Sequence, residues 1–304
     1  MLKILLDAKH KSSYKKGMNK LPLAKRVQIL AMLCEGSSMR SISRVCDVSI
    51  NTVTKLLVDA GHACIAFHDE KVRGLTCKRI QCDEIWSFCF ARPKNLKASK
   101  NPPEGAGELW TWTSICSDSK LMCNWVVGGR DAYNAMMLMD DLASRLTHRV
   151  QLTTDANRAY LEAVEGAFGA DIDFGQLVKI YGDNVTDAER KYAPSECIGI
   201  RKRAVEGNPD PAHISTSYVE RQNLQMRMSM RRFTRLTNAH SKKLANHCHA
   251  LALYFTFYNW VRLHSSLRMS PAMAAGLTET LMSWEDLVSV IDAFDGSQEK
   301  QNSN

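Results

Sequence analysis

The chain has 304 residues, of which 45% are hydrophobic and 24% are charged. This composition is typical of a folded protein with a sizeable core, and it argues against an intrinsically disordered chain. No uncharged apolar run reaches ~18 residues, so we expect no transmembrane helix. The N-terminal stretch "MLKILLDAKHKSSYKK" is too polar for a secretory signal, and the ten cysteines are therefore expected to be reduced thiols in a cytoplasmic protein.

The net charge of +8 is unevenly distributed along the chain. Residues 1–60 carry a net charge of +7, and residues 221–268 carry +9 without a single Asp or Glu, so the remainder is acidic. Phosphate neutralisation would attract a polyanion such as DNA to the two basic flanks. A charge pattern that only keeps the protein soluble is the alternative.

Helical patterns begin close to Met18, whereas residues 1–17 have no clear period and are predicted to be an extension. We predict one helix from Pro22 to Gly36, a second in "SSMRSISRVC", and a third that is capped by Ser49 and ends at Gly61. Three short helices with a tight turn before the third predict a helix-turn-helix DNA-binding domain over residues 18–61. A trihelical protein-interaction module is the alternative.

The third of these helices would carry the DNA contacts. Asn51, Thr52 and Lys55 are predicted to reach bases or phosphates in a major groove. The small core of the domain is predicted to consist of five apolar side chains, namely Ile42, Val45, Val48, Val53 and Leu57.

After a predicted linker over 62–76, the pattern changes to strands. "KRIQCDEIWSFCF", "ELWTWTSIC" and "LMCNWVVGG" are predicted strands, the last two joined by a hairpin turn at 117–120. Further strands are expected in "RVQLTTD" and "QLVKIYG", with helices over 131–147, 157–167, 215–236, 239–260 and 283–294, an irregular insertion near 182–214, and a polar tail from Gly296. This order predicts an α/β fold for residues 77–276, with a mixed sheet and flanking helices, followed by a C-terminal helix and tail over 277–304.

Three carboxylates stand out by their predicted placement. Asp83 lies in the first strand, Asp155 ends a later strand, and Glu220 begins a long helix, at successive separations of 72 and 65 positions. Such groups can converge only through the fold, and oxygen ligands of this kind suit Mg²⁺. Two such ions can support in-line displacement at phosphorus. The alternative for each of these residues is a solvated surface carboxylate.

The spacing after Glu220 adds a basic element to this prediction. Glu220, Asn223 and Arg227 share one helical face, and Arg231 extends the positive surface. We therefore predict that Asn223, Arg227 and Arg231 bind DNA beside the metal site. Glu84 is expected to point to the opposite face of its strand from Asp83, unless a bulge reverses the choice.

The segments "CDEIWSF", "LTTDANRAY" and "STSYVERQNLQMRMSMRRFTRLTNAHSKKLANH" followed by "YFTFYNWVRLHSSLRMSPAMAAG" resemble the DDE transposases of bacterial insertion sequences, in particular insertion-sequence family one and its relatives. The resemblance extends from Met18 to about Gly276. It implies a ribonuclease H-like catalytic domain behind a DNA-binding module, and Mg²⁺- or Mn²⁺-dependent cleavage and transfer of DNA strands. It also implies double-stranded DNA partners (transposon ends and target), a homo-oligomer on DNA, and a nucleoid-associated location in a bacterium.

Residue by residue, the resemblance assigns the catalytic, metal-binding triad to Asp83, Asp155 and Glu220. Arg227 matches the basic residue seven positions after the glutamate. The pattern "YN…R.H" is matched at Tyr258, Asn259, Arg262 and His264. The 65-residue gap before Glu220 is longer than in compact relatives, and the N-terminal cysteine pairs of a zinc finger are not found.

Two other functions use parts of the same evidence. A non-catalytic DNA-binding regulator or a decayed transposase would need only residues 18–61, whereas a site-specific DNA nuclease would use the same triad without strand transfer. The regulator has no reason to bring the three carboxylates together. No Gly-rich phosphate loop is found, so we expect no ATP requirement.

Overall fold

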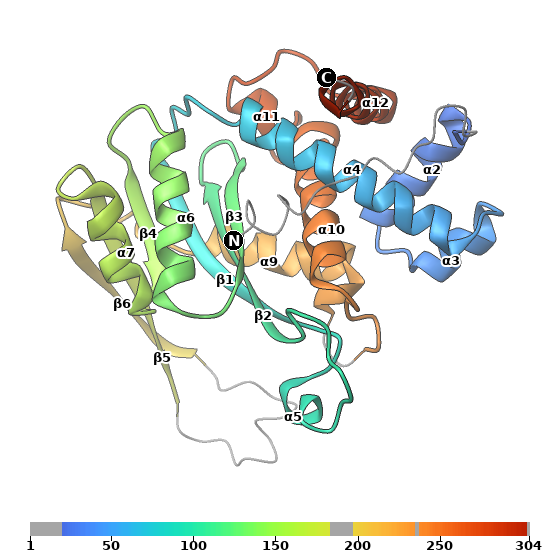
Figure 1. Ribbon diagram of the computed structural model, residues 1–304. Coiled ribbons are helices and arrows are strands. Elements are labelled where there is room, and N and C mark those ends of the chain that lie inside the picture. The colour runs from blue at the N-terminus through green and yellow to red at the C-terminus, as the bar shows by residue number, and fades with distance from the viewer. Residues whose placement is uncertain (1–19, 183–196, 235–236, 303–304) are drawn as a thin grey trace.

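The computed structural model describes residues 20–182, 197–234 and 237–302 (Figure 1). The predicted extension over 1–17 lies outside these residues, as does the stretch 183–196 of the predicted insertion. The strands are β1 (Arg79–Cys89), β2 (Gly107–Cys116), β3 (Met122–Gly128), β4 (Gln151–Asp155), β5 (Asp173–Tyr181) and β6 (Cys197–Glu206). The helices are α2 (Leu23–Cys34), α3 (Met39–Val45), α4 (Ile50–Lys71), α5 (Pro93–Leu96), α6 (Ala132–Arg145), α7 (Ala159–Phe168), α9 (Ser217–Ser229), α10 (Leu244–Thr256), α11 (Pro271–Ala274) and α12 (Trp284–Asn302), with a 3₁₀ turn at Arg231–Phe233 and a π turn at Phe257–Val261.

The six strands form one mixed sheet in the order β3-β2-β1-β4-β5-β6. β1, β2 and β3 are antiparallel, and the hairpin turn predicted at 117–120 joins the last two. β4 runs parallel to β1 and β5 parallel to β4, while β6 returns antiparallel at the edge. The prediction of a mixed sheet with flanking helices is confirmed, and the strand order is consistent with a ribonuclease H-like fold.

Two hydrophobic cores lie on opposite faces of this sheet. α6 and α7 cover one face, where Cys82 and Trp112 pack against Leu138 and Tyr160. On the other face, Ile85 belongs to the core that α4, α9 and α10 share with α2, α3 and α12 (Figure 1). Alternate residues of β1 therefore enter different cores. Within the described part of the chain, no helix is both long enough and apolar enough to cross a membrane.

The N-terminal helices appear where the sequence predicts them, with one correction at the third. Ser38 and Ser49 cap α3 and α4 through their hydroxyl oxygens. α4 does not end at Gly61 but continues to Lys71, so most of the predicted linker over 62–76 is helix. Gly61 is needed for close packing and not for a cap, because a Cβ there would lie 2.3 Å from the Cβ of His249 in α10.

We therefore predict that Gly61→Ala destabilises the protein although alanine is the better helix former. Overpacking a core typically costs about 1–3 kcal/mol, which exceeds the gain of about 1 kcal/mol in helix propensity. Gly166→Ala in α7 is the matched control, because nothing lies within 4 Å of its added Cβ. Denaturant unfolding should show a lower midpoint for Gly61→Ala and an unchanged or higher one for Gly166→Ala. Equal midpoints would contradict the packing role.

Four other expectations are corrected by the structure. Val45 is 61% exposed and not part of the core, whereas Ile42, Val53 and Leu57 are buried as predicted. Residues 197–206 of the predicted insertion form β6, which is largely exposed at the edge of the sheet. The helix predicted over 215–236 ends at Ser229, because the chain turns extended at Met230. α12 passes through Gly296, where a polar tail was expected.

Candidate metal-binding active site

The site begins where two central strands separate. β1 and β4 pair from Arg79–Gln151 only as far as Gln81–Thr153. Asp83 lies just beyond the last pair on β1, and Asp155 is the last residue of β4. Because no ladder joins the strands past this point, their side chains can meet in the gap between them.

The third predicted carboxylate is positioned by a buried glutamine on β1. The side-chain oxygen of Gln81 accepts hydrogen bonds from the backbone N–H groups of Tyr218 (2.8 Å) and Val219 (3.2 Å) in the first turn of α9. These groups have no partner within the helix. Gln81 therefore fixes the start of α9 on β1, and Glu220 follows in the same turn.

Replacing Gln81 with methionine should release this contact. Two N–H donors would lose their acceptor, and the amides of Tyr218 and Val219 should exchange hydrogen faster than in the wild-type protein. Gln176→Met on β5 is the control, because Gln176 is equally buried but donates to the backbone oxygen of Asp155. Unchanged exchange at both amides in the Gln81 variant would show that another contact holds α9.

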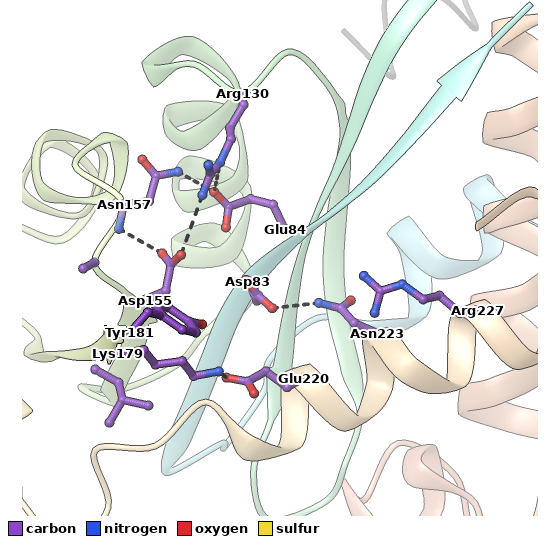
Figure 2. Close-up of a pocket in the computed structure, with 12 residues that line it drawn as sticks. Asp83, Glu84, Arg130, Asp155, Asn157, Lys179, Tyr181, Glu220, Asn223 and Arg227 are labelled. Carbon is purple, nitrogen blue, oxygen red and sulfur yellow. Dashed lines mark hydrogen bonds and ion pairs between the residues drawn. The ribbon is translucent and has the colours of Figure 1, made fainter. Parts of the chain in front are cut away.

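The three predicted carboxylates line one open pocket of about 700 Å³ (Figure 2). Asn223 and Arg227 line it too, so the prediction that Glu220, Asn223 and Arg227 share one helical face is confirmed. The other lining residues are Glu84, Arg130, Ala156, Asn157, Leu177, Lys179 and Tyr181.

Asp83 and Asp155 are held by hydrogen bonds from different elements. The Asn223 amide donates to Asp83 Oδ2 at 2.8 Å, and the backbone N–H of Asn157 donates to Asp155 Oδ1 at 3.0 Å. Burial, together with the charges of Glu84 and Asp155, raises the pKa of Asp83 to about 7. Burial also raises the pKa of Asp155. The pocket therefore concentrates negative charge at a cost that a bound cation would remove.

Glu84 joins this cluster, although it points to the opposite face of its strand from Asp83, as strand alternation predicts. Its side chain does leave β1 on the α6 face, opposite to Asp83. Its carboxylate nevertheless reaches the gap between β1 and β4, where Asp83, Glu84 and Asp155 each place one oxygen within 4.8 Å of the others. Alternation fixes the face from which a side chain starts, while an open strand edge lets a long side chain reach around it.

Two basic residues of the pocket were missed by the sequence analysis. Lys179 Nζ lies 2.7 Å from Glu220 Oε1, and Arg130 contacts Glu84 at 3.2 Å and Asp155 at 3.8 Å (Figure 2). Partial burial opposes the charged form of Lys179, but the hydrogen bond and charge of Glu220 raise its pKa above the ordinary value. The one available signal was the position of Lys179 on the strand that follows Asp155, next to that strand in the sheet.

The residues present fit a hard divalent cation. Ligand oxygens of an octahedral Mg²⁺ ion lie about 2.9 Å apart when neighbouring and about 4.2 Å apart when opposite, so oxygens within 4.8 Å of one another could bind one ion after they draw closer by up to about 2 Å. Two further observations support the fit: Glu84 Oε2 and Asn223 Oδ1 are buried and have no hydrogen-bond partner among the described residues. Glu220 lies in the same pocket but outside the three-carboxylate cluster.

The predicted DNA-binding residues fall into two groups. Asn223 is buried and donates to Asp83, whereas Arg231 is exposed. At the start of α4, Asn51 is exposed, Thr52 takes part in the Ser49 cap, and Lys55 pairs with Asp59 at 2.8 Å. DNA contact by α4 stays a prediction.

The "YN…R.H" pattern has a structural role at its first two positions. Asn259 exchanges two hydrogen bonds of 2.9 Å with the backbone N–H and C=O of Met122, and the Tyr258 hydroxyl donates to the Lys120 carbonyl at 3.0 Å. β3 is an edge strand, so these side chains cover backbone groups that would otherwise lack partners. They do not line the pocket.

No protein-family model matches the sequence, and no curated protein sequence matches it. Among solved structures, a piggyBac transposase synaptic complex with hairpin DNA matches with 8% identity and a TM-score of 0.38, covering 100% of this chain and 77% of that one. A Mos1 transposase paired-end complex with left transposon end matches with 11% identity and a TM-score of 0.21, covering 54% of this chain and 62% of that one. The Mos1 strand transfer complex matches with 12% identity and a TM-score of 0.23, covering 83% of this chain and 80% of that one. The chain thus spans less than two thirds of the Mos1 protein in the paired-end complex, and TM-scores this low carry no argument about its activity.

Proposed function

We propose that this protein is a transposase of a bacterial insertion sequence, which binds the ends of its element and catalyses metal-dependent cleavage and transfer of DNA strands. The observation that carries the proposal is the meeting of Asp83, Asp155 and Glu220 in one pocket from positions 72 and 65 residues apart. A regulator that only binds DNA has no use for this charge cluster, which destabilises the fold unless a cation is bound.

The pocket residues would divide the work as follows. Asp83, Asp155 and Glu220 would hold Mg²⁺ or Mn²⁺, which supplies charge neutralisation at phosphorus and an activated oxygen nucleophile. Asn223 keeps Asp83 oriented, and Arg130, Lys179 and Arg227 supply positive charge along the pocket wall for the DNA backbone. In the first step water would attack phosphorus and release a 3′-hydroxyl, and in the second this hydroxyl would attack a target phosphodiester.

The basic flanks would bind the rest of the DNA. Asn51, Thr52 and Lys55 at the start of α4 would contact the element end, and Arg231 would contact the backbone beyond the pocket. Because two ends must be joined to one target, we expect the protein to act as a homo-oligomer on double-stranded DNA, in the bacterial cytoplasm at the nucleoid.

The test uses labelled DNA from the borders of the element, a plasmid target and Mg²⁺ or Mn²⁺. Wild-type protein should cut at the element end and join the freed 3′-end to the plasmid, whereas Asp155→Asn should bind the ends without cutting them. Asp140→Asn, on the exposed side of α6, is the matched control and should behave like the wild type. Binding without cutting by the wild-type protein would favour the regulator, and cutting without joining would favour the nuclease.

A further inference from the structure

Glu84 is a buried charged residue of the pocket in which one carboxylate oxygen lacks a hydrogen-bond partner among the described residues. The residue is 8% exposed, and its Oε1 atom accepts from both Arg130 Nε (3.2 Å) and the Asn157 side-chain amide. Its Oε2 atom is buried and has no hydrogen-bond partner among the described residues. A buried carboxylate oxygen without a partner lowers the stability of the fold. A cation that binds this oxygen would remove that cost, and its binding free energy would be more favourable as a result.

Geometry distinguishes Glu84 from Glu220. The oxygens of Asp83, Glu84 and Asp155 lie within 4.8 Å of one another, which is close to the span of one coordination sphere. Glu220 is instead engaged by Lys179 at 2.7 Å and by the Thr216 hydroxyl, both through Oε1. A cation that enters the metal-free pocket therefore meets three carboxylates that already converge, and Glu220 is not one of them.

We infer that Glu84 is a ligand of the first divalent cation that the pocket binds, together with Asp83 and Asp155. Glu220 is not required for this ion, and it is left as a ligand for a second one. The inference rests on the proposed function only in that a divalent cation must enter this pocket. It assigns four carboxylates to the site, one more than the predicted triad.

A purely structural role for Glu84 would leave part of the site unexplained. Arg130 could serve as its neutralising partner, but the guanidinium contacts only Oε1, is shared with Asp155, and stacks over the Trp110 ring at 4.8 Å. Arg130 thus lies at the solvent side of the cluster and leaves Oε2 facing inward (Figure 2).

The test is a titration of metal-free, full-length protein with Mn²⁺, in which free Mn²⁺ is followed by electron paramagnetic resonance. Glu84→Gln should weaken the first binding step at least about tenfold, as should Asp83→Asn, because each removes a charged ligand. Glu220→Gln should leave the first step close to the wild-type value and weaken only the second. Glu165→Gln, on the exposed side of α7, should change neither. A first step that is unchanged in Glu84→Gln but weakened in Glu220→Gln would overturn the inference.

A second variant guards against a folding defect in Glu84→Gln. Arg130→Gln removes the cation that competes for Glu84 and Asp155, so the first Mn²⁺ should bind more tightly, and a misfolded site cannot produce this gain. The increase in affinity for the first Mn²⁺ caused by Arg130→Gln should be smaller when Glu84→Gln is also present. An increase of the same size with and without Glu84→Gln would contradict a role for Glu84. These readouts do not depend on DNA. Weaker binding of the first ion in Glu84→Gln supports the inference even if the wild-type protein cuts no DNA. If binding of the first ion is unchanged in Glu84→Gln, the inference fails even if the wild-type protein cuts DNA.

Discussion

Replacing Asp83 with asparagine is expected to stabilise the metal-free protein at pH 8 while abolishing metal-dependent strand cleavage. The pKa of Asp83 is raised from 3.8 to about 7 in the folded protein. A raised carboxyl pKa favours folding below pH 3.8, and this contribution is lost as the pH rises through 7. At pH 8 the buried charge therefore destabilises the fold, and asparagine removes that charge while it keeps an oxygen for the Asn223 amide. The shift corresponds to about 4 kcal/mol, and even half of this gain would raise the melting temperature by about 4 °C.

Calorimetry at two pH values checks the stability half of this prediction. The melting temperature of Asp83→Asn should exceed that of the wild type at pH 8, and the difference should be less than half as large at pH 5, where the folded-state aspartate is protonated. Added Mg²⁺ should stabilise the wild type at pH 8 and stabilise the variant less at the same Mg²⁺ concentration. Strand cleavage should fall on the order of 10³-fold or more, because a ligand of the reaction centre is lost. A variant that is less stable than the wild type at pH 8 would show that Asp83 serves the fold and not a cation.

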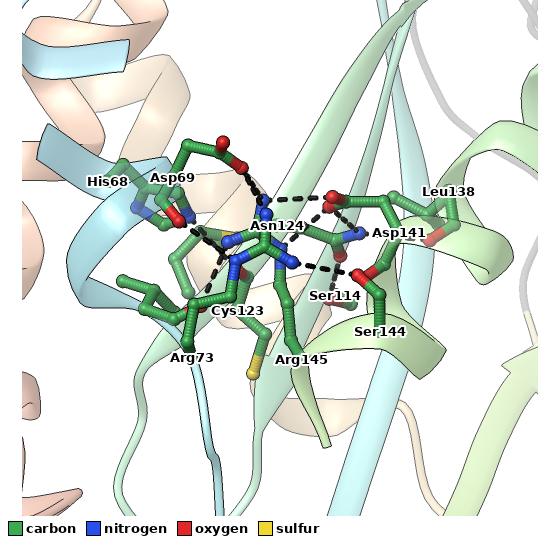
Figure 3. A network of polar contacts seen from close by, with 12 residues as sticks. His68, Asp69, Arg73, Ser114, Cys123, Asn124, Leu138, Asp141, Ser144 and Arg145 are labelled. Carbon is green, nitrogen blue, oxygen red and sulfur yellow. Dashed lines mark hydrogen bonds and ion pairs between the residues drawn. The ribbon is translucent and has the colours of Figure 1, made fainter. Parts of the chain in front are cut away.

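Replacing Arg145 with methionine should cause the largest loss of stability. The Arg145 side chain is buried at the end of α6 and donates to Asp141 at 2.7 and 2.9 Å, to Asp69 of α4 at 2.9 Å, and to the Val72 carbonyl at 2.9 Å (Figure 3). This network joins α4 to the helical layer over the sheet. Breaking a buried pair by removing one partner costs about 3–5 kcal/mol, and because Asp141 is partly exposed we expect about 2–3 kcal/mol.

Arg73→Met is the matched control, because Arg73 binds Asp69 and the Ser144 hydroxyl at the same place but is 39% exposed. It should cost less than about 1 kcal/mol. Burial alone would raise the pKa of Asp141, but the hydrogen bond and charge of Arg145 outweigh it and lower that pKa. The contribution is therefore present above pH 3.8 and is lost as the pH falls further, so urea unfolding should show the gap between Arg145→Met and the wild type narrowing as the pH falls below 3.8. Similar losses in both variants at pH 7 would contradict the role of the buried pair.

The sequence predicted those parts of the site that depend on local periodicity and strand order. Glu220, Asn223 and Arg227 share a face because α9 is regular over that span, and Asp83 and Asp155 meet because they lie where β1 and β4 end their pairing. Five of the six strands of the sheet lie where the sequence predicts them, and β6 was not predicted. That strand escaped notice because an edge strand exposed on both faces lacks the apolar alternation from which strands are predicted.

The missed features are those that only tertiary packing decides. Gly61 has the sequence signature of a helix end, but it is a helix crossing point because His249, far along the chain, packs against it. Glu84 starts on the expected face and still reaches the pocket, because the sheet opens beside it. Asn259 was singled out by its match to the family pattern, and its partner is the backbone of an edge strand. Each of these depends on a neighbour that periodicity cannot identify.

Anomalous diffraction from crystals of the protein grown with Mn²⁺ is the most direct measurement. A strong peak should lie between the carboxylates of Asp83 and Asp155, at bonding distance from both, and should disappear in Asp155→Asn. A pocket that stays without a peak at saturating Mn²⁺, or a peak held by other residues, would contradict a metal-dependent active site at this place.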